Sequence, residues 1–199
     1  MRSFSFPTLL TLALAALVFV GCDSSDDTDD GGGGGIGGGG TQGSGSVSVS
    51  GNNGSFSGSG YAGFDSTENT FGIAVFDGSI NDLASGLGGS TGAFEYFAIV
   101  FENVAGVPGE GTYTVGDETS DVFIVYFDSV SETSFRVVTS TGGTVEVTGS
   151  SGSNIRGTFS VTGDLIDISD PTSSEAVTLT GNFNAVVLDE DDFPDVGGV

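Results

Sequence analysis

The chain has 199 residues and a formal net charge of −24, because 27 acidic residues are set against only three arginines, with no lysine and no histidine. Without a basic patch the protein cannot neutralise phosphates, so nucleic-acid binding is excluded as a function. The lack of histidine and lysine excludes a Ser-His-Asp relay and Schiff-base chemistry, and a single cysteine excludes an internal disulfide and the usual Cys/His zinc site.

The N-terminus combines a short apolar segment with the only cysteine. Leu9–Val20 is too short to span a bilayer and follows Arg2, which is typical of a secretory signal peptide. The junction at 18–22 (VFVGC) resembles the lipobox of bacterial lipoproteins, in which the cysteine is acylated and becomes the new N-terminus. The resemblance implies cleavage between Gly21 and Cys22, lipidation of Cys22, and attachment to the outer membrane in the cell envelope. The alternative is an ordinary signal peptide that ends beside a cysteine.

After Cys22 the segment up to residue 45 is acidic and then glycine-rich. This composition buries no apolar surface and predicts a disordered tether with a span of about 25 Å. The acidic block also resembles export signals of surface-exposed Bacteroidota lipoproteins, and leaves open whether the protein faces the periplasm or the cell surface. Residues 189–199 are acidic again and predict a frayed tail. One domain is therefore expected at 46–188, where 17 acids and two arginines give a formal charge of −15.

Residues 46–188 consist of short β-type runs separated by Gly, Asn, Asp and Ser. Several runs alternate cleanly, as where Ile155, Phe159 and Val161 oppose Thr158 and Ser160, which is typical of antiparallel sheet with one solvated face. We therefore predict the all-β class, with a single β-sandwich or barrel of eight to ten strands. The predicted strands are 46–50, 55–64, 70–77, 94–102, 111–115, 122–128, 134–139, 144–148, 154–162 and 176–187.

Two runs, 94–101 and 122–127, are apolar on both faces, so another layer has to cover their second face. One candidate is a short helix at 79–87, whose apolar residues follow the i, i+3, i+4, i+7 spacing. The alternative is an exposed aromatic surface for a partner or ligand, although core packing is the favoured interpretation. The candidate binding face comprises Phe94, Tyr96, Phe97, Phe101, Tyr126 and Phe127.

Carboxylates supply the chemistry that remains. Two acids suffice for glycoside hydrolysis, but nothing in the sequence pairs two of them, and no tryptophan is present for sugar stacking. The candidate acids are Glu95, Glu102, Asp128, Glu132 and Glu146.

Calcium is the metal that these residue types suit best, because it prefers oxygen ligands. Asp164, Asp167 and Asp170 gather around a predicted turn and form the candidate metal site, although aspartates that simply shape a turn are the favoured interpretation. Arg136 and Arg156 are the only cations of the domain, and we expect them to pair with nearby carboxylates.

The segments 154–160 (NIRGTFS) and 177–183 (VTLTGNF), with Gly111-Thr112-Tyr113 upstream, resemble small Bacteroidota-type lipoproteins in a family of unknown function. The likeness covers about residues 95–187 and implies an all-β domain without supplying catalytic residues. The sequence thus predicts a monomeric, lipid-anchored envelope protein without a cofactor, which binds or scaffolds an envelope protein or glycan and is not an enzyme. A carboxylate-dependent glycan hydrolase and a calcium-binding structural module are the alternatives.

Overall fold

The computed structural model of the chain describes residues 43–51, 53–66, 68–76, 95–117, 120–131, 134–167 and 170–188. The predicted signal peptide with Gly21 and Cys22, the predicted helix at 79–87, Phe94 and the tail at 189–199 lie outside the described residues. No helix that is long and apolar enough to cross a membrane occurs in the described part of the chain.

The described residues form nine β-strands and no helix, which confirms the predicted all-β class. The strands are rich in β-branched and aromatic residues, which favour the pleated, half-buried surface of a sheet. They are β1 (Ser44–Val49), β2 (Ser55–Asp65), β3 (Thr70–Phe76), β4 (Glu95–Phe101), β5 (Gly111–Val115), β6 (Val122–Ser131), β7 (Ser134–Ser150), β8 (Asn154–Asp167) and β9 (Asp170–Val187).

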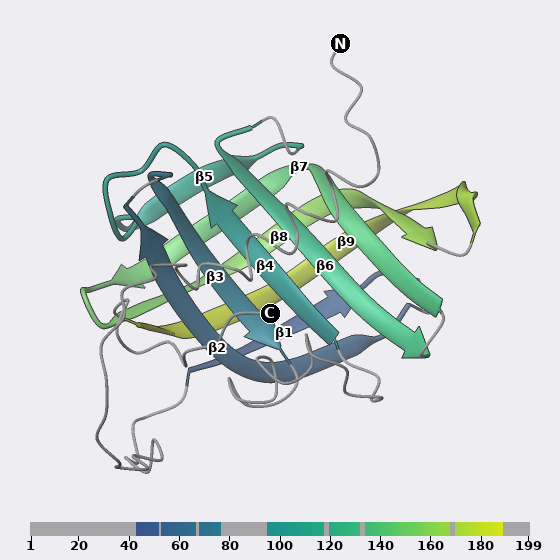
Figure 1. The fold of residues 1–199 in the computed structure, drawn as a ribbon, viewed down its shortest axis with the longest axis horizontal. Helices are drawn as coiled ribbons and strands as arrows, with labels where there is room; N and C mark the ends of the chain where they lie inside the picture. Colours follow the sequence, from purple (N-terminus) through teal and green to yellow (C-terminus); the bar gives the residue numbers. More distant parts are fainter. Residues whose placement is uncertain are drawn as a thin grey trace, which may run out of the picture.

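Eight of these strands close into a barrel (Figure 1). The order around the ring is β7-β6-β4-β3-β2-β1-β9-β8, β8 pairs with β7 again, and each of these pairings is antiparallel. β5 is an additional strand that pairs with residues 143–147 of β7, next to the part of β7 that pairs with β6. Of the two predicted architectures the chain therefore adopts the barrel, in which closure removes the exposed edges of the sheet.

β7 is one continuous strand, although its glycine pair indicates a turn and the sequence predicts two strands, 134–139 and 144–148. A β-bulge between Ser140 and Gly142 inserts one residue, so the inward-facing positions change from even-numbered to odd-numbered residues. Gly143 adopts a φ of +128°, and a Cβ at this position would meet a carbonyl oxygen of β8 at 2.4 Å. The glycines therefore allow the strand to continue through the bulge.

Other differences concern strand ends. β8 and β9 form a longer hairpin than predicted, because β8 continues to Asp167 and β9 begins at Asp170. β1 begins at Ser44, within the segment predicted as tether. The strand at 111–115 has the predicted bounds.

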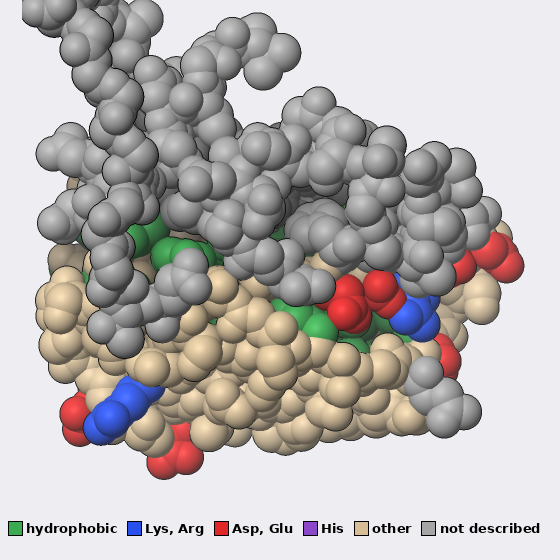
Figure 2. All heavy atoms as spheres, turned by 90° about the horizontal axis from the view of Figure 1, so that it is seen from below, with side chains coloured by type: hydrophobic (Ala, Val, Ile, Leu, Met, Phe, Trp, Pro, Cys, Tyr) green, Lys and Arg blue, Asp and Glu red, His purple; other side chains and the backbone are tan. Residues whose placement is uncertain are grey.

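The outer surface of the barrel has two contrasting sides. On β3, β4, β6 and adjoining strands the outward side chains are aromatic or aliphatic; we call this the apolar outer side. Its members are Tyr61, Ala74, Phe76, Tyr96, Ala98, Val100, Phe123, Val125, Phe127 and Val137. On β5, the second half of β7, β8, β9, β1 and the start of β2 the outward residues are mostly Ser, Thr and Asn; we call this the hydroxyl outer side. In Figure 2, which views the barrel from the side of β1 and β2, most of the surface drawn in colour is neither charged nor hydrophobic.

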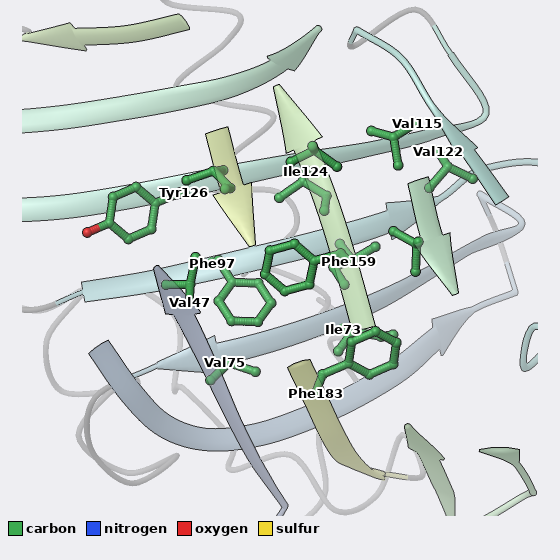
Figure 3. Packing of buried hydrophobic residues seen from close by; sticks show 14 of the residues in the cluster. Val47, Ile73, Val75, Phe97, Val115, Val122, Ile124, Tyr126, Phe159 and Phe183 are labelled. Atoms are coloured by element: carbon green, nitrogen blue, oxygen red, sulfur yellow. The ribbon is translucent and has the colours of Figure 1, made fainter. Parts of the chain in front are cut away.

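Inward-facing side chains fill the barrel. Phe97, Phe159 and Phe183 all lie in this core (Figure 3), and each is at most 4% exposed. Gly157 is paired with Phe183, and Gly181 with Phe159, across β8 and β9. A Cβ at either glycine would meet the paired ring, at 2.6 Å from Phe183 or 2.5 Å from Phe159. The inward alternation predicted for these two strands is confirmed, and its glycines make room for the rings.

Candidate functional site at the barrel mouth

A row of charged residues crosses four adjacent strands at one end of the barrel. Glu95 on β4 is paired with Asp128 on β6, Asp128 with Arg136 on β7, and Arg136 with Asp167 on β8. Paired residues of neighbouring strands share a face, and Tyr126, two residues before Asp128, points into the core, so the row lies on the inner face of the opening. We define the mouth cluster as Asn53, Glu95, Tyr126, Asp128, Arg136, Asp167 and Glu175.

An ion pair between Arg136 and Asp128 occupies the middle of this row. Arg136 Nε donates to Asp128 Oδ2 at 3.0 Å, and Nη2 contacts the same oxygen. The Asp128 side chain is 9% exposed and that of Arg136 27%, so the carboxylate is the more deeply buried partner. Arg136 Nη1 also donates to Asn53 Oδ1 at 3.3 Å. The predicted local pairing is thus confirmed for Arg136, whereas Arg156 lies over Gly149 on the outside and forms no ion pair with a carboxylate in the described ranges.

Tyr126 and Asn53 engage two further carboxylates of the mouth cluster, Glu95 and Glu175. Tyr126 Oη donates to Glu95 Oε1 at 2.8 Å, and in Figure 3 this hydroxyl points away from the other labelled core residues. Burial, followed by the hydrogen bond to Glu95, raises the pKa of Tyr126 well above its ordinary value, so the hydroxyl remains a donor at neutral pH. Asn53 Nδ2 donates to Glu175 Oε1 at 3.4 Å. Figure 2 shows acidic and basic side chains gathered beside hydrophobic ones near one end of the molecule.

Of the carboxylates proposed for hydrolysis, the structure brings two together. Glu95 and Asp128 are directly paired, which places their Cβ atoms about 5 Å apart. Glu102 follows the last residue of β4 and lies at the opposite end of the barrel, and Glu146 is exposed on the outer surface. Glu132 lies outside the described residues. Glu95 and Asp128 therefore form the one described pair among these candidates that resembles a two-carboxylate site.

The structure does not assemble the predicted calcium site. Asp164 is exposed on the outside of β8, whereas Asp167 belongs to the mouth cluster and is paired with Asp170. Asp164 and Asp167 are three residues apart on one strand, so they point to opposite faces. In the ranges that the structure describes, no three acidic side chains come together in an arrangement that could hold a metal ion.

The predicted aromatic binding face is divided between the inside and the outside of the barrel. Phe97, Phe101 and Tyr126 point inward and are at most 1% exposed, so the favoured interpretation of core packing is confirmed for them. Tyr96 and Phe127 point outward, where their rings stack with centroids 5.4 Å apart. These residues therefore do not form one binding surface, because successive residues of a strand point to opposite faces.

The hydroxyl outer side is not among the features predicted from the sequence. Its signal is the repeated spacing of Ser, Thr or Asn at every second position, as at 112–114, 158–162 and 178–184. The pattern is visible within each single strand. Only the register between strands reveals that these residues form one continuous surface.

No protein-family model, curated protein or solved structure matches the chain. Its function is therefore inferred from the chemistry of the sequence and from the geometry of the described residues.

Proposed function

We propose that this protein is a non-catalytic binding module of the cell envelope, anchored to the outer membrane by a lipid on Cys22. The junction at Gly21-Cys22 and the acidic, glycine-rich segment after it support the anchor. The observation that carries the binding role is that side chains fill the barrel, which leaves the outer surface to meet a partner. The mouth carboxylates are already engaged, by Tyr126 and Arg136 among others, which favours a structural role for them over proton transfer.

The anchor is tested by expressing the full chain and its Cys22→Ser variant in a Gram-negative host and fractionating the cells. We expect the unmodified chain in the outer-membrane fraction, with a fatty acid on Cys22 that metabolic labelling detects. The Cys22→Ser variant should incorporate no label and leave that fraction. Outer-membrane retention of the unlabelled variant would contradict the proposed lipid anchor.

The binding role is tested by immobilising the full chain in detergent and presenting glycan and protein fractions from an envelope separately. Saturable binding of one fraction, without any change in the bound material, is the expected result. Failure of both fractions to bind, with the barrel folded by circular dichroism, would contradict it.

A second candidate function is carboxylate-dependent glycan hydrolysis, which the pairing of Glu95 with Asp128 favours. Release of reducing ends from envelope glycans, abolished by Glu95→Gln, would support this candidate and contradict a non-catalytic role. Glu102→Gln is the matched control, because Glu102 follows the last residue of β4, at the end of the barrel opposite the mouth. If the unmodified protein releases no reducing ends, the non-catalytic binding function stands.

A further inference from the structure

The hydroxyl outer side contains two complete rows of paired residues that cross six strands. One row is Thr112, Glu146, Thr158, Asn182, Ser46 and Ser57, and the other is Thr114, Thr144, Ser160, Thr180, Ser48 and Ser55. Ten of these twelve residues carry a hydroxyl group. Neighbours within a row are about 4.8 Å apart, and the rows themselves are about 6.7 Å apart along each strand. The surface is thus a regular grid of small polar groups.

The hydroxyls in the middle of this grid are available to a partner. Thr144, Thr158, Ser160 and Thr180 are all exposed, and their side chains form no hydrogen bond with any other residue in the described part of the chain. Each hydroxyl offers one donor and two acceptor positions. They therefore match a partner that also donates and accepts hydrogen bonds at closely spaced positions.

The charge of the grid excludes several classes of partner. Glu146 is the single charged residue in the two rows, although the domain as a whole carries −15. The negative field of the domain repels anionic polymers, and most of the acidic positions that would attract a cationic polymer lie outside the grid. An uncharged partner meets the grid without an electrostatic penalty, and the single carboxylate of Glu146 offers a cationic polymer only one charge to pair with in the two rows.

The residue types and the shape of the grid narrow the choice further. Neither row contains an aromatic or aliphatic residue, so a protein partner would find none of the anchors that dominate protein–protein interfaces. The rows also follow the twisted, closed ring, so they wrap around a convex surface. A flexible chain can follow such a surface, whereas a flat rigid one would touch only a few strands.

We propose that the hydroxyl outer side binds an uncharged polysaccharide chain, through many individually weak hydrogen bonds between its side chains and the sugar hydroxyls. This proposal rests on the proposed binding function and names the class of its partner. Repetition supplies the affinity, because a repeating chain engages several neighbouring residues at once. The acidic remainder of the domain then selects neutral chains over anionic ones.

The test measures binding of the full chain in detergent to neutral soluble glucans, with dextran and laminarin as probes, and to anionic alginate. The informative variant combines Thr144→Val, Thr158→Val and Thr180→Val, because valine keeps the shape of threonine and removes only the hydroxyl. We expect binding to at least one neutral glucan, weakened about tenfold or more in the triple variant. Binding to alginate should be absent.

Two control variants show whether glucan binding depends on the hydroxyls of the grid. Ser66→Ala removes an exposed hydroxyl in the β2–β3 turn, away from the grid, and should leave glucan binding unchanged. A second variant combines Thr144→Val and Thr180→Val with Thr158→Ser. It keeps one of the three hydroxyls and should recover part of the affinity that the triple variant loses. Unchanged binding in the triple variant, preference for alginate, or no binding to either glucan would overturn the proposal. If an envelope protein binds instead, the binding function stands while its glycan partner is wrong.

Discussion

The two outer sides of the barrel share one ring of strands and one core, but differ in how far their outward side chains are exposed. On the apolar outer side Phe76, Tyr96 and Phe127 are paired across three strands, and Phe76 and Tyr96 are at most 3% exposed although they point away from the barrel. On the hydroxyl outer side the corresponding residues, such as Thr158 and Thr180, are exposed. The inner faces therefore define the barrel, and the outer faces divide it into a buried apolar part and an exposed hydroxyl-bearing part.

Strand β7 contributes residues to both outer sides. The outward residue Val137, before the bulge of β7, packs against the apolar outer side, whereas Thr144, after the bulge, belongs to the hydroxyl outer side. The bulge thus marks the change from one outer side to the other. The inward residues Val138, before the bulge, and Val145, after it, are both buried in the core.

The largest expected difference in the free energy of unfolding is between two alanine variants, one from each outer side. Phe76→Ala should lower the free energy of unfolding by about 3–5 kcal/mol, because it removes a buried ring that stacks on Tyr61 with centroids 5.5 Å apart. The matched change Thr180→Ala on the hydroxyl outer side should cost less than about 0.5 kcal/mol. Urea unfolding followed by tyrosine fluorescence measures both. Equal costs would abolish the distinction between the two sides.

The second largest loss of stability is expected when the ion pair that joins β6 to β7 at the mouth is broken. Arg136→Gln leaves the buried Asp128 carboxylate without its cation and should lower the free energy of unfolding by about 2–3 kcal/mol, below the cost for fully buried pairs because Arg136 is partly exposed. Adding Asp128→Asn should recover part of this loss in the same urea assay. A double variant no more stable than the single one would show that the carboxylate does not need its partner.

A smaller effect tests the core that both sides share. Gly181→Ala brings a Cβ within 2.5 Å of the Phe159 ring and 2.1 Å of the Ser46 carbonyl oxygen, so it should cost about 1–3 kcal/mol. Gly152→Ala is the control, because a Cβ there would meet no atom within 4 Å. Thermal unfolding measures both variants, and an unchanged melting temperature for Gly181→Ala would contradict the close packing of β8 against β9.

The smallest effect concerns the end of the barrel opposite the mouth. Burial, and then the charges of Asp121 and Glu68, raise the pKa of Glu102 above its ordinary value of 4.5. The folded state thus holds this proton more tightly than the unfolded state, so the contribution of Glu102 to stability is complete below pH 4.5 and is lost as the pH rises through the raised pKa. Glu102→Gln should flatten this dependence and stabilise the protein at pH 7 by less than about 1 kcal/mol. Urea unfolding between pH 4 and 7 checks the sign, and a Glu102→Gln variant that is less stable at pH 7 would contradict it.

Sequence patterns predict much of the fold, because alternation in a strand with one wet face depends on local residues only. This is why the inward set on β8 and β9, with Phe159 and Phe183, is predicted correctly. The prediction of two strands in place of β7 is wrong because its bulge inverts the alternation and requires glycine where glycine usually indicates a turn. In 94–101 and 122–127, where both faces are apolar, alternation separates two sets of residues but does not show which set faces the core.

The mouth cluster and the hydroxyl outer side could not be predicted in the same way. Glu95, Asp128, Arg136 and Asp167 become neighbours only through the register of four strands, and that register depends on the closed ring. The three aspartates of the candidate calcium site are not brought together for a related reason, since the residues around Asp164 extend a hairpin where the composition indicates a turn.

Closure of the ring by its first and last strands determines how the chain can fold. The seam between β1 and β9 brings together Ser46 and Asn182, whose side chains are hydrogen-bonded at 2.8 Å although 136 residues separate them in sequence. Contacts of this kind form late and slowly, because the loop between them must first be ordered. Folding of the barrel should therefore be slow and cooperative, and a chain that stops before β9 would leave β1 and β8 as unpaired edges open to aggregation.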